Sequence, residues 1–140
     1  MFQSVTESLA IGNLSSPEEL QEIAQKGYST LIDLCTATEG TKLNAEEVQK
    51  LGFNYISIPV SPQNLNSEVL KTFSETVNTA SQPVYIRCAS GLRAGVFTLL
   101  TLADQQNWTK QEYLQRHQEL GLEHKPNCPI KAFSEENFAG

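Results

Sequence analysis

The stretch Pro83–Ala103, PVYIRCASGLRAGVFTLLTLA, carries the clearest indications of the fold. Its first part, Val84–Arg87, is a short run rich in β-branched and aromatic residues after a proline, which is typical of a strand. Residues 95–103 are apolar on almost every face, which predicts a helix buried on all sides. A compact polar turn, Cys88–Arg93, joins the two. A strand that leads through a turn into a buried helix is typical of a parallel α/β sheet.

The rest of the chain continues this alternation of helices and strands, divided by polar caps and glycines. The expected segments are an early strand at 8–11 along one edge of the sheet, a helix from 16 to 27, a strand at 30–34, a helix from 44 to 52, a strand at 54–59, a helix through 69–77 and a last helix from 109 to about 121. Crossovers of a dozen or more residues favour parallel pairing with right-handed connections. We therefore expect an α/β fold, a three-layer α/β/α domain with a central, mainly parallel sheet of four to five strands.

The size and charge of the chain limit its organisation and its partners. Its 140 residues suffice for one domain, which we expect over residues 1–124, followed by an irregular tail, 125–140, that packs on the domain or extends from it. The net charge of −6 argues against nonspecific binding to nucleic acid or to a membrane surface. Without a membrane-spanning stretch or a recognisable signal peptide, a cytoplasmic location is expected.

The polar turn after the 84–87 strand is the expected place of the chemistry, because ligands bind outside the carboxyl ends of parallel strands. Successive amides of the turn, the positive end of the next helix and the Arg93 guanidinium would hold a tetrahedral oxyanion against the Cys88 sulfur. The same field favours the thiolate, which is the nucleophilic form of cysteine. The expected ligand-binding amides are those of Ala89, Ser90, Gly91, Leu92 and Arg93. The alternative is an inert cysteine at a tight turn with a surface arginine nearby.

The other two cysteines, Cys35 and Cys128, form no C-x-x-C pair with each other or with Cys88, and the chain has only two histidines. We therefore expect neither a metal site nor any other cofactor. A regulatory disulfide between Cys35 and Cys88 is conceivable, but a thiol that lines the pocket or the core is the more ordinary interpretation of Cys35. Cys128 is interpreted as an incidental surface or packing thiol.

Three motifs resemble those of a known superfamily: SLAIGN-x-SSPEELQEIAQKGYSTLIDL at 8–34, NYISIPVSP at 54–62 and, most specifically, YIRCASGLRAG at 85–95. From 8 to about 122 the chain resembles the cysteine-dependent protein tyrosine and dual-specificity phosphatases and the rhodaneses. It is most similar to the phosphatase-like family named for the N-terminal domain of beta-lactamase hydrolase-like proteins, which carries a Cys-x-x-Gly-x-Arg loop. The resemblance implies a tyrosine-phosphatase-like fold, with Cys88 as the nucleophile and Arg93 as the oxyanion-binding arginine.

The sequence departs from the tyrosine-phosphatase pattern at several positions. Arg87 stands where a histidine usually precedes the cysteine, and Ala94 stands where a Ser or Thr hydroxyl usually follows the arginine. The resemblance places a general-acid Asp in the loop 60–66, which holds no carboxylate, and an absent acid lowers the rate by about 10²–10⁴-fold. Asp33 and Glu39 remain as candidate acids, although the more ordinary interpretation pairs Asp33 structurally with Arg87 and places Glu39 in a solvated loop.

Three functions remain open. The first is phosphomonoester hydrolysis through a Cys88 thiophosphate, on a phosphorylated small molecule or a phosphoprotein. The second is rhodanese-like sulfur transfer through a Cys88 persulfide, which requires a sulfur donor but no carboxylic acid, and the rhodaneses share this loop length. The third is a catalytically impaired module that binds phosphate or phosphoproteins. The sequence specifies neither the natural substrate nor the oligomeric state.

Overall fold

The computed structural model describes residues 1–122 and 128–138. Its strands are β1 (Phe2–Ser4), β2 (Leu9–Gly12), β3 (Thr30–Asp33), β4 (Asn54–Ser57) and β5 (Val84–Arg87). Its helices are α1 (Pro17–Gln25), α2 (Ala45–Lys50), α3 (Ser67–Thr79), α4 (Leu92–Gln106), α5 (Lys110–Glu119) and α6 (Pro129–Glu136), with short 3₁₀ turns η1 (Ala37–Glu39) and η2 (Pro62–Asn64). The strands form one sheet in the order β1-β2-β5-β3-β4, in which β1 and β2 are antiparallel and the other neighbours are parallel.

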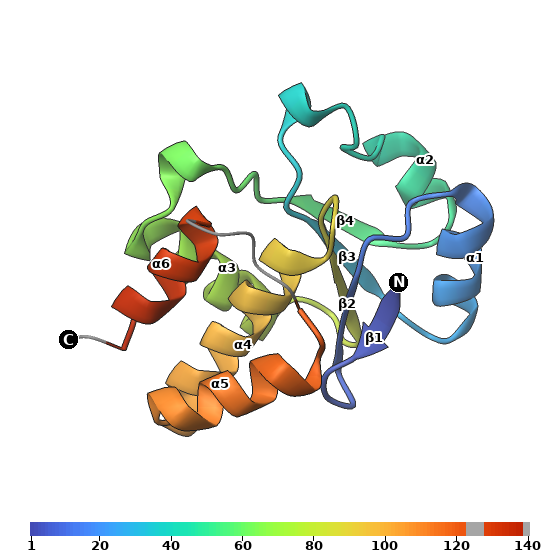
Figure 1. Ribbon diagram of the computed structural model, residues 1–140. Helices are drawn as coiled ribbons and strands as arrows, with labels where there is room; N and C mark the ends of the chain where they lie inside the picture. Colours follow the sequence, from blue (N-terminus) through green and yellow to red (C-terminus); the bar gives the residue numbers. More distant parts are fainter. Residues whose placement is uncertain (123–127, 139–140) are drawn as a thin grey trace.

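Helices cover both faces of the sheet, because alternate strand residues point to opposite sides (Figure 1). Ile11, Ile32 and Ile86 share an apolar core with residues of α3, α4, α5 and α6. Leu31 and Tyr85 face the other way, toward α1 and α2. The expected three-layer α/β/α domain with a mainly parallel sheet is confirmed.

Helix α4 lies against the middle of the sheet, as its apolar sequence predicts. Every residue from Ala94 to Ala103 is buried. The helix begins after Gly91, whose φ of 89° lies in the left-handed region that glycine adopts without the strain a Cβ brings. The turn between β5 and α4 is therefore tight. Within the described residues, neither α4 nor another helix combines the length and the hydropathy that a membrane span requires.

Two parts of the chain differ from the prediction. The early strand is β2, and it lies inside the sheet rather than along its edge, because Phe2–Ser4 pairs with it as the edge strand β1. A strand of three residues is too short for an alternating pattern to reveal it. The tail predicted to be irregular contains α6, which begins with Pro129 and packs Ile130 and Phe133 against the core. Residues 125–127 lie outside the described residues, and the domain boundary at 124 stays a prediction.

A buried ion pair joins the ends of β3 and β5. Arg87 Nη1 donates to Asp33 Oδ1 and to the Thr41 carbonyl, at 2.9 Å each. The second carboxylate oxygen of Asp33 accepts from the Leu43 amide and the Tyr55 hydroxyl, also at 2.9 Å each. Both charged side chains are buried. The predicted structural pairing of Asp33 with Arg87 is confirmed, and the pair anchors the loop after β3.

Replacing Asp33 by Asn should lower the free energy of unfolding by about 3 kcal/mol, because Arg87 would stay buried without a countercharge. Chemical denaturation monitored by circular dichroism measures this loss. Asp104→Asn, at an exposed position of α4, is the matched control and should change the free energy of unfolding by less than about 0.5 kcal/mol. Equal stability of the Asp33→Asn variant and the unmodified protein would contradict the anchoring role.

Candidate active site

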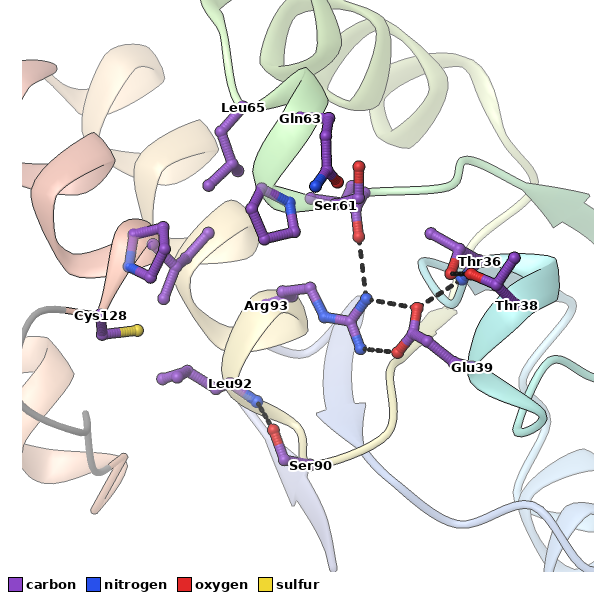
Figure 2. A pocket seen from close by; sticks show the side chains of 14 residues that line it. Thr36, Thr38, Glu39, Ser61, Gln63, Leu65, Ser90, Leu92, Arg93 and Cys128 are labelled. Carbon is purple, nitrogen blue, oxygen red and sulfur yellow. Dashed lines mark hydrogen bonds and ion pairs between the residues drawn. The ribbon is translucent and has the colours of Figure 1, made fainter.

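The loops that follow β3, β4 and β5 meet at the carboxyl edge of the sheet, where parallel α/β proteins bind ligands. Together with the start of α6 they surround a cavity of about 440 Å³ (Figure 2). This volume falls within the range of small-molecule sites. Residues from each segment line it, among them Thr36, Glu39, Ser61, Leu65, Arg93 and Ile130.

Cys88 follows β5 directly and is fully buried at the base of its loop. Its Sγ accepts hydrogen bonds from the backbone amides of Gly91, at 3.1 Å, and Ala94, at 3.5 Å. Both amides belong to the N-terminal end of α4, where the helix dipole is positive. Donors of this kind stabilise negative charge on sulfur. Ala94 supplies its amide but no hydroxyl, as the sequence indicates.

The five amides predicted to bind an anion do not all have the same role. The Gly91 amide is directed at the Cys88 sulfur, and the Leu92 amide donates to Ser90 Oγ at 3.3 Å. Within residues 1–122 and 128–138, no group accepts from the amides of Ala89, Ser90 or Arg93. These three donors are therefore unpaired in this part of the chain.

Arg93 is held by acceptors from two neighbouring loops. Its Nη1 donates to the Val60 carbonyl at 2.8 Å and approaches the Leu34 carbonyl at 3.4 Å. Its two terminal nitrogens also pair with the Glu39 carboxylate, Nη1 with Oε2 at 2.9 Å and Nη2 with Oε1 at 2.5 Å (Figure 2). The hydrogen bonds of this ion pair raise the pKa of Arg93 and lower the pKa of Glu39 to about 2. The pair is therefore ionised near neutral pH.

Neither candidate acid is placed to protonate a leaving group. Asp33 is fully buried in its pair with Arg87 and does not line the cavity. Glu39 lies in an exposed loop, as expected, and it lines the cavity as the partner of Arg93. With a pKa of about 2 it is a carboxylate, which accepts hydrogen bonds and has no proton to give. Among the described residues that line the cavity, Glu39 is the one carboxylate.

The three cysteines have different surroundings, and none of them forms a disulfide. Cys35 is buried beyond β3, with its Sγ 3.3 Å from Thr41 Oγ1 and 3.5 Å from Arg87 Nη1. Burial raises the pKa of the Cys35 thiol, so this thiol stays protonated. Cys128 packs against the core and also lines the cavity, which its place in the tail did not indicate. Pro129 could have indicated this place for Cys128, because proline is favoured at the first position of a helix and Cys128 directly precedes it.

This arrangement defines a class of protein. The sheet is mainly parallel, and a Cys-x-x-Gly-x-Arg turn leads from its middle strand into a buried helix, which is the fold of the tyrosine-phosphatase-like proteins. Within that class, the chain belongs to the family of the beta-lactamase hydrolase-like protein, phosphatase-like domain, whose model matches residues 1–105. Helices α5 and α6 lie beyond the matched part. A comparison with curated proteins found no match.

Solved structures share the fold over nearly the whole chain. A DUF442 protein from Shewanella putrefaciens CN-32, named as a suspected phosphatase, has a TM-score of 0.79 at 21% identity and covers 99% of this chain and 91% of its own. A suspected phosphatase from Neisseria meningitidis Z2491 has a TM-score of 0.75 at 20% identity, covering 96% and 94%. TpbA from P. aeruginosa has a TM-score of 0.78 at 16% identity, covering 96% and 89%, and a variant of TpbA was crystallised with pTyr. At these identities the likeness establishes the fold.

Proposed function

We propose that this protein is a cysteine-dependent phosphatase that hydrolyses phosphomonoesters through a thiophosphate intermediate on Cys88. One observation carries the proposal: amides at the start of α4 donate to the Cys88 sulfur while the amides of Ala89, Ser90 and Arg93 are left for an oxyanion. Membership of a phosphatase-like family and a tyrosine-phosphatase-like fold support a hydrolase of this class.

The reaction has two displacements at phosphorus. The Cys88 thiolate attacks the phosphoryl group, an S–P bond forms, and the bond to the leaving oxygen breaks. The free loop amides bind the nonbridging oxygens, where negative charge is concentrated. Water then attacks phosphorus, the S–P bond breaks, and inorganic phosphate leaves. Because Cys88 is fully buried, the exposed part of the loop, Ala89 and Ser90, has to rearrange as the phosphate enters.

An apolar, aryl leaving group suits the cavity. Leu65, Leu92 and Ile130 line it beside Arg93, so an aromatic ring attached to the bound phosphate would lie against apolar side chains. TpbA, which shares the fold, was crystallised with pTyr, and this supports an aryl phosphate as the substrate class. The substrate is then a phosphorylated small molecule or a phosphoprotein that presents such a group.

The rate of hydrolysis should depend steeply on the leaving group, because Glu39 is ionised and the Asp33 carboxylate is buried away from the cavity. We expect p-nitrophenyl phosphate to be hydrolysed at least about 10²-fold faster than an alkyl phosphate, since its phenolate departs without a proton. Release of inorganic phosphate from a series of aryl and alkyl phosphates measures this dependence. Equal rates across the series would mean that a proton donor operates in the site.

Sulfur transfer is the second candidate, because a Cys88 persulfide requires no carboxylic acid and none is placed to act. Two parallel assays distinguish the activities. One measures the phosphate that a phosphatase releases from an aryl phosphate, and the other measures the thiocyanate that a sulfurtransferase forms from thiosulfate and cyanide. Phosphate release without thiocyanate supports the proposed phosphatase. Thiocyanate alone would overturn it, and binding of phosphate without either reaction would identify a binding module.

A further inference from the structure

The Cys88 loop has neighbours on two sides, because β5 lies between β2 and β3 in the sheet. On one side the loops after β3 and β4 enclose the cavity. On the other side lies the end of β2, where the Cys88 amide donates to the Gly12 carbonyl at 3.2 Å. Among the described residues that line the cavity, none comes from β1 or β2. The contacts on this second side of the loop therefore need another explanation.

Met1 lies against the Cys88 loop on the β2 side. A Cβ placed on Gly91 would overlap with Met1 Cε, and it would lie 3.8 Å from Met1 Sδ. A Cβ placed on Gly12 would overlap with the Met1 carbonyl oxygen, which accepts from the Asn13 amide at 3.0 Å. The Met1 methyl group thus fills the space that a side chain of residue 91 would occupy.

Gly91 makes two of the hydrogen bonds that shape the Cys88 loop. Its amide donates to Cys88 Sγ at 3.1 Å, and its carbonyl accepts from the Gly95 amide at 2.9 Å in the first turn of α4. Gly91 is buried, whereas Ala89 and Ser90 before it are exposed. Glycine adopts positive and negative φ about equally, so its own backbone preference does not fix the φ of 89°. Contacts from outside the loop therefore help to decide where the Gly91 amide points.

We infer that Met1 is a positioning residue for the proposed reaction: by packing on Gly91 it keeps the Gly91 amide directed at the Cys88 sulfur. The contact matters most while the exposed part of the loop rearranges around an entering phosphoryl group. The inference rests on the proposed function for the identity of that group. The alternative is an incidental contact of a half-exposed side chain. Positioning accounts for the geometry better, because Gly12 and Gly91 together leave the space that Met1 occupies.

The test removes the methyl contact and includes two controls. Met1→Ala takes the contact away, and norleucine in place of Met1 keeps a methyl group at the end of a side chain of the same length. Because the sequence has one methionine, norleucine changes no other residue of the chain. Leu114→Ala, on α5, is the matched control, since Leu114 and Met1 are the exposed large hydrophobic residues of the described part of the chain. All proteins are released from the same amino-terminal fusion, so that each begins at residue 1.

Two measurements report on the loop. The first is the pH dependence of Cys88 alkylation by iodoacetamide, followed by mass spectrometry of the Cys88 peptide because Cys128 is also partly exposed. Met1→Ala should move the midpoint of this profile to higher pH, since the thiolate loses part of a hydrogen bond. The second is hydrolysis of an aryl phosphate, in which kcat/KM should fall by about tenfold, as expected when a hydrogen bond to a charged group is lost. The norleucine protein and Leu114→Ala should match the unmodified protein in both measurements.

The same proteins separate positioning from an incidental or a merely structural contact. An unchanged alkylation profile in Met1→Ala would overturn the inference, whether or not the thermal unfolding temperature falls. An equal shift in the norleucine protein would also overturn it, because the Met1 sulfur rather than the methyl contact would then be responsible. If the profile shifts in Met1→Ala but the unmodified protein hydrolyses no phosphomonoester, the proposed phosphatase function fails and the positioning role stands.

Discussion

Replacing Cys88 by Ser should lower the rate of aryl phosphate hydrolysis by about 10⁴-fold or more, because removal of a catalytic nucleophile leaves only the contribution of the binding groups. A serine hydroxyl has nearly the shape of the thiol, but it does not ionise near neutral pH. The two amides that donate to sulfur would then face a neutral oxygen. A Cys88→Ser protein that keeps its activity would rule out the site and the covalent mechanism together.

A measurement of phosphate binding distinguishes the loss of the nucleophile from the loss of the folded structure. The Cys88→Ser variant should still bind inorganic phosphate, since Arg93 and the amides of Ala89 and Ser90 are unchanged. Cys35→Ser is the control for the change from sulfur to oxygen, and it should keep most of the activity because the Cys35 thiol stays protonated. Calorimetry with phosphate, thermal unfolding and the hydrolysis assay on both variants complete the comparison.

The fold could be predicted from the sequence where its physical signals are local. Residues 95–103 are apolar on almost every face, and a helix of that kind is stable only when neighbours cover it, as β2, β5, α3, α5 and α6 do here. Helices α1 and α5 begin at the capping boxes that their sequences show. By contrast, β1 exists because β2 pairs with it, and three residues carry no periodicity of their own. Helix α6 begins with a proline and has a short apolar face. The tail sequence around it shows no clear period, so the pattern did not predict this helix.

The candidate site could be located from the sequence, but its internal contacts could not. Cys88 and Arg93 follow a predicted strand, and ligands of parallel sheets bind at the carboxyl ends of the strands. The partner of Arg93 depends on the conformation of the loop after β3, in which the turn η1 brings Glu39 across to α4. A loop conformation of this kind leaves no periodic pattern in the sequence from which it could be predicted. The sequence therefore presents Glu39 as a candidate acid, whereas in the structure Glu39 is the partner of Arg93.

Replacing Arg93 by Ala should lower kcat/KM for an aryl phosphate by about 10³-fold, which is typical of removing a charged group that stabilises a transition state. Arg93→Lys should recover little of this loss, because an ammonium offers no bidentate edge to two oxygens. Arg116→Ala, at an exposed position of α5, is the matched control and should leave hydrolysis unchanged. Steady-state kinetics on the three variants measure these effects. Full activity of Arg93→Lys would show that charge alone, without the planar geometry, is sufficient.

The same Arg93→Ala variant should also change the pH dependence of stability. In the unmodified protein the hydrogen bonds from Arg93 lower the pKa of Glu39 from an ordinary value of 4.5 to about 2. A group whose pKa is lowered by folding contributes stability above its unfolded pKa, and that contribution is lost as the pH falls from about 4.5 toward 2. Without Arg93 the Glu39 pKa should return toward 4.5, and this part of the acid-induced loss of stability should disappear. Denaturation curves between these pH values test the change, and an unaltered pH profile would mean that Arg93 is not the cause of the low pKa.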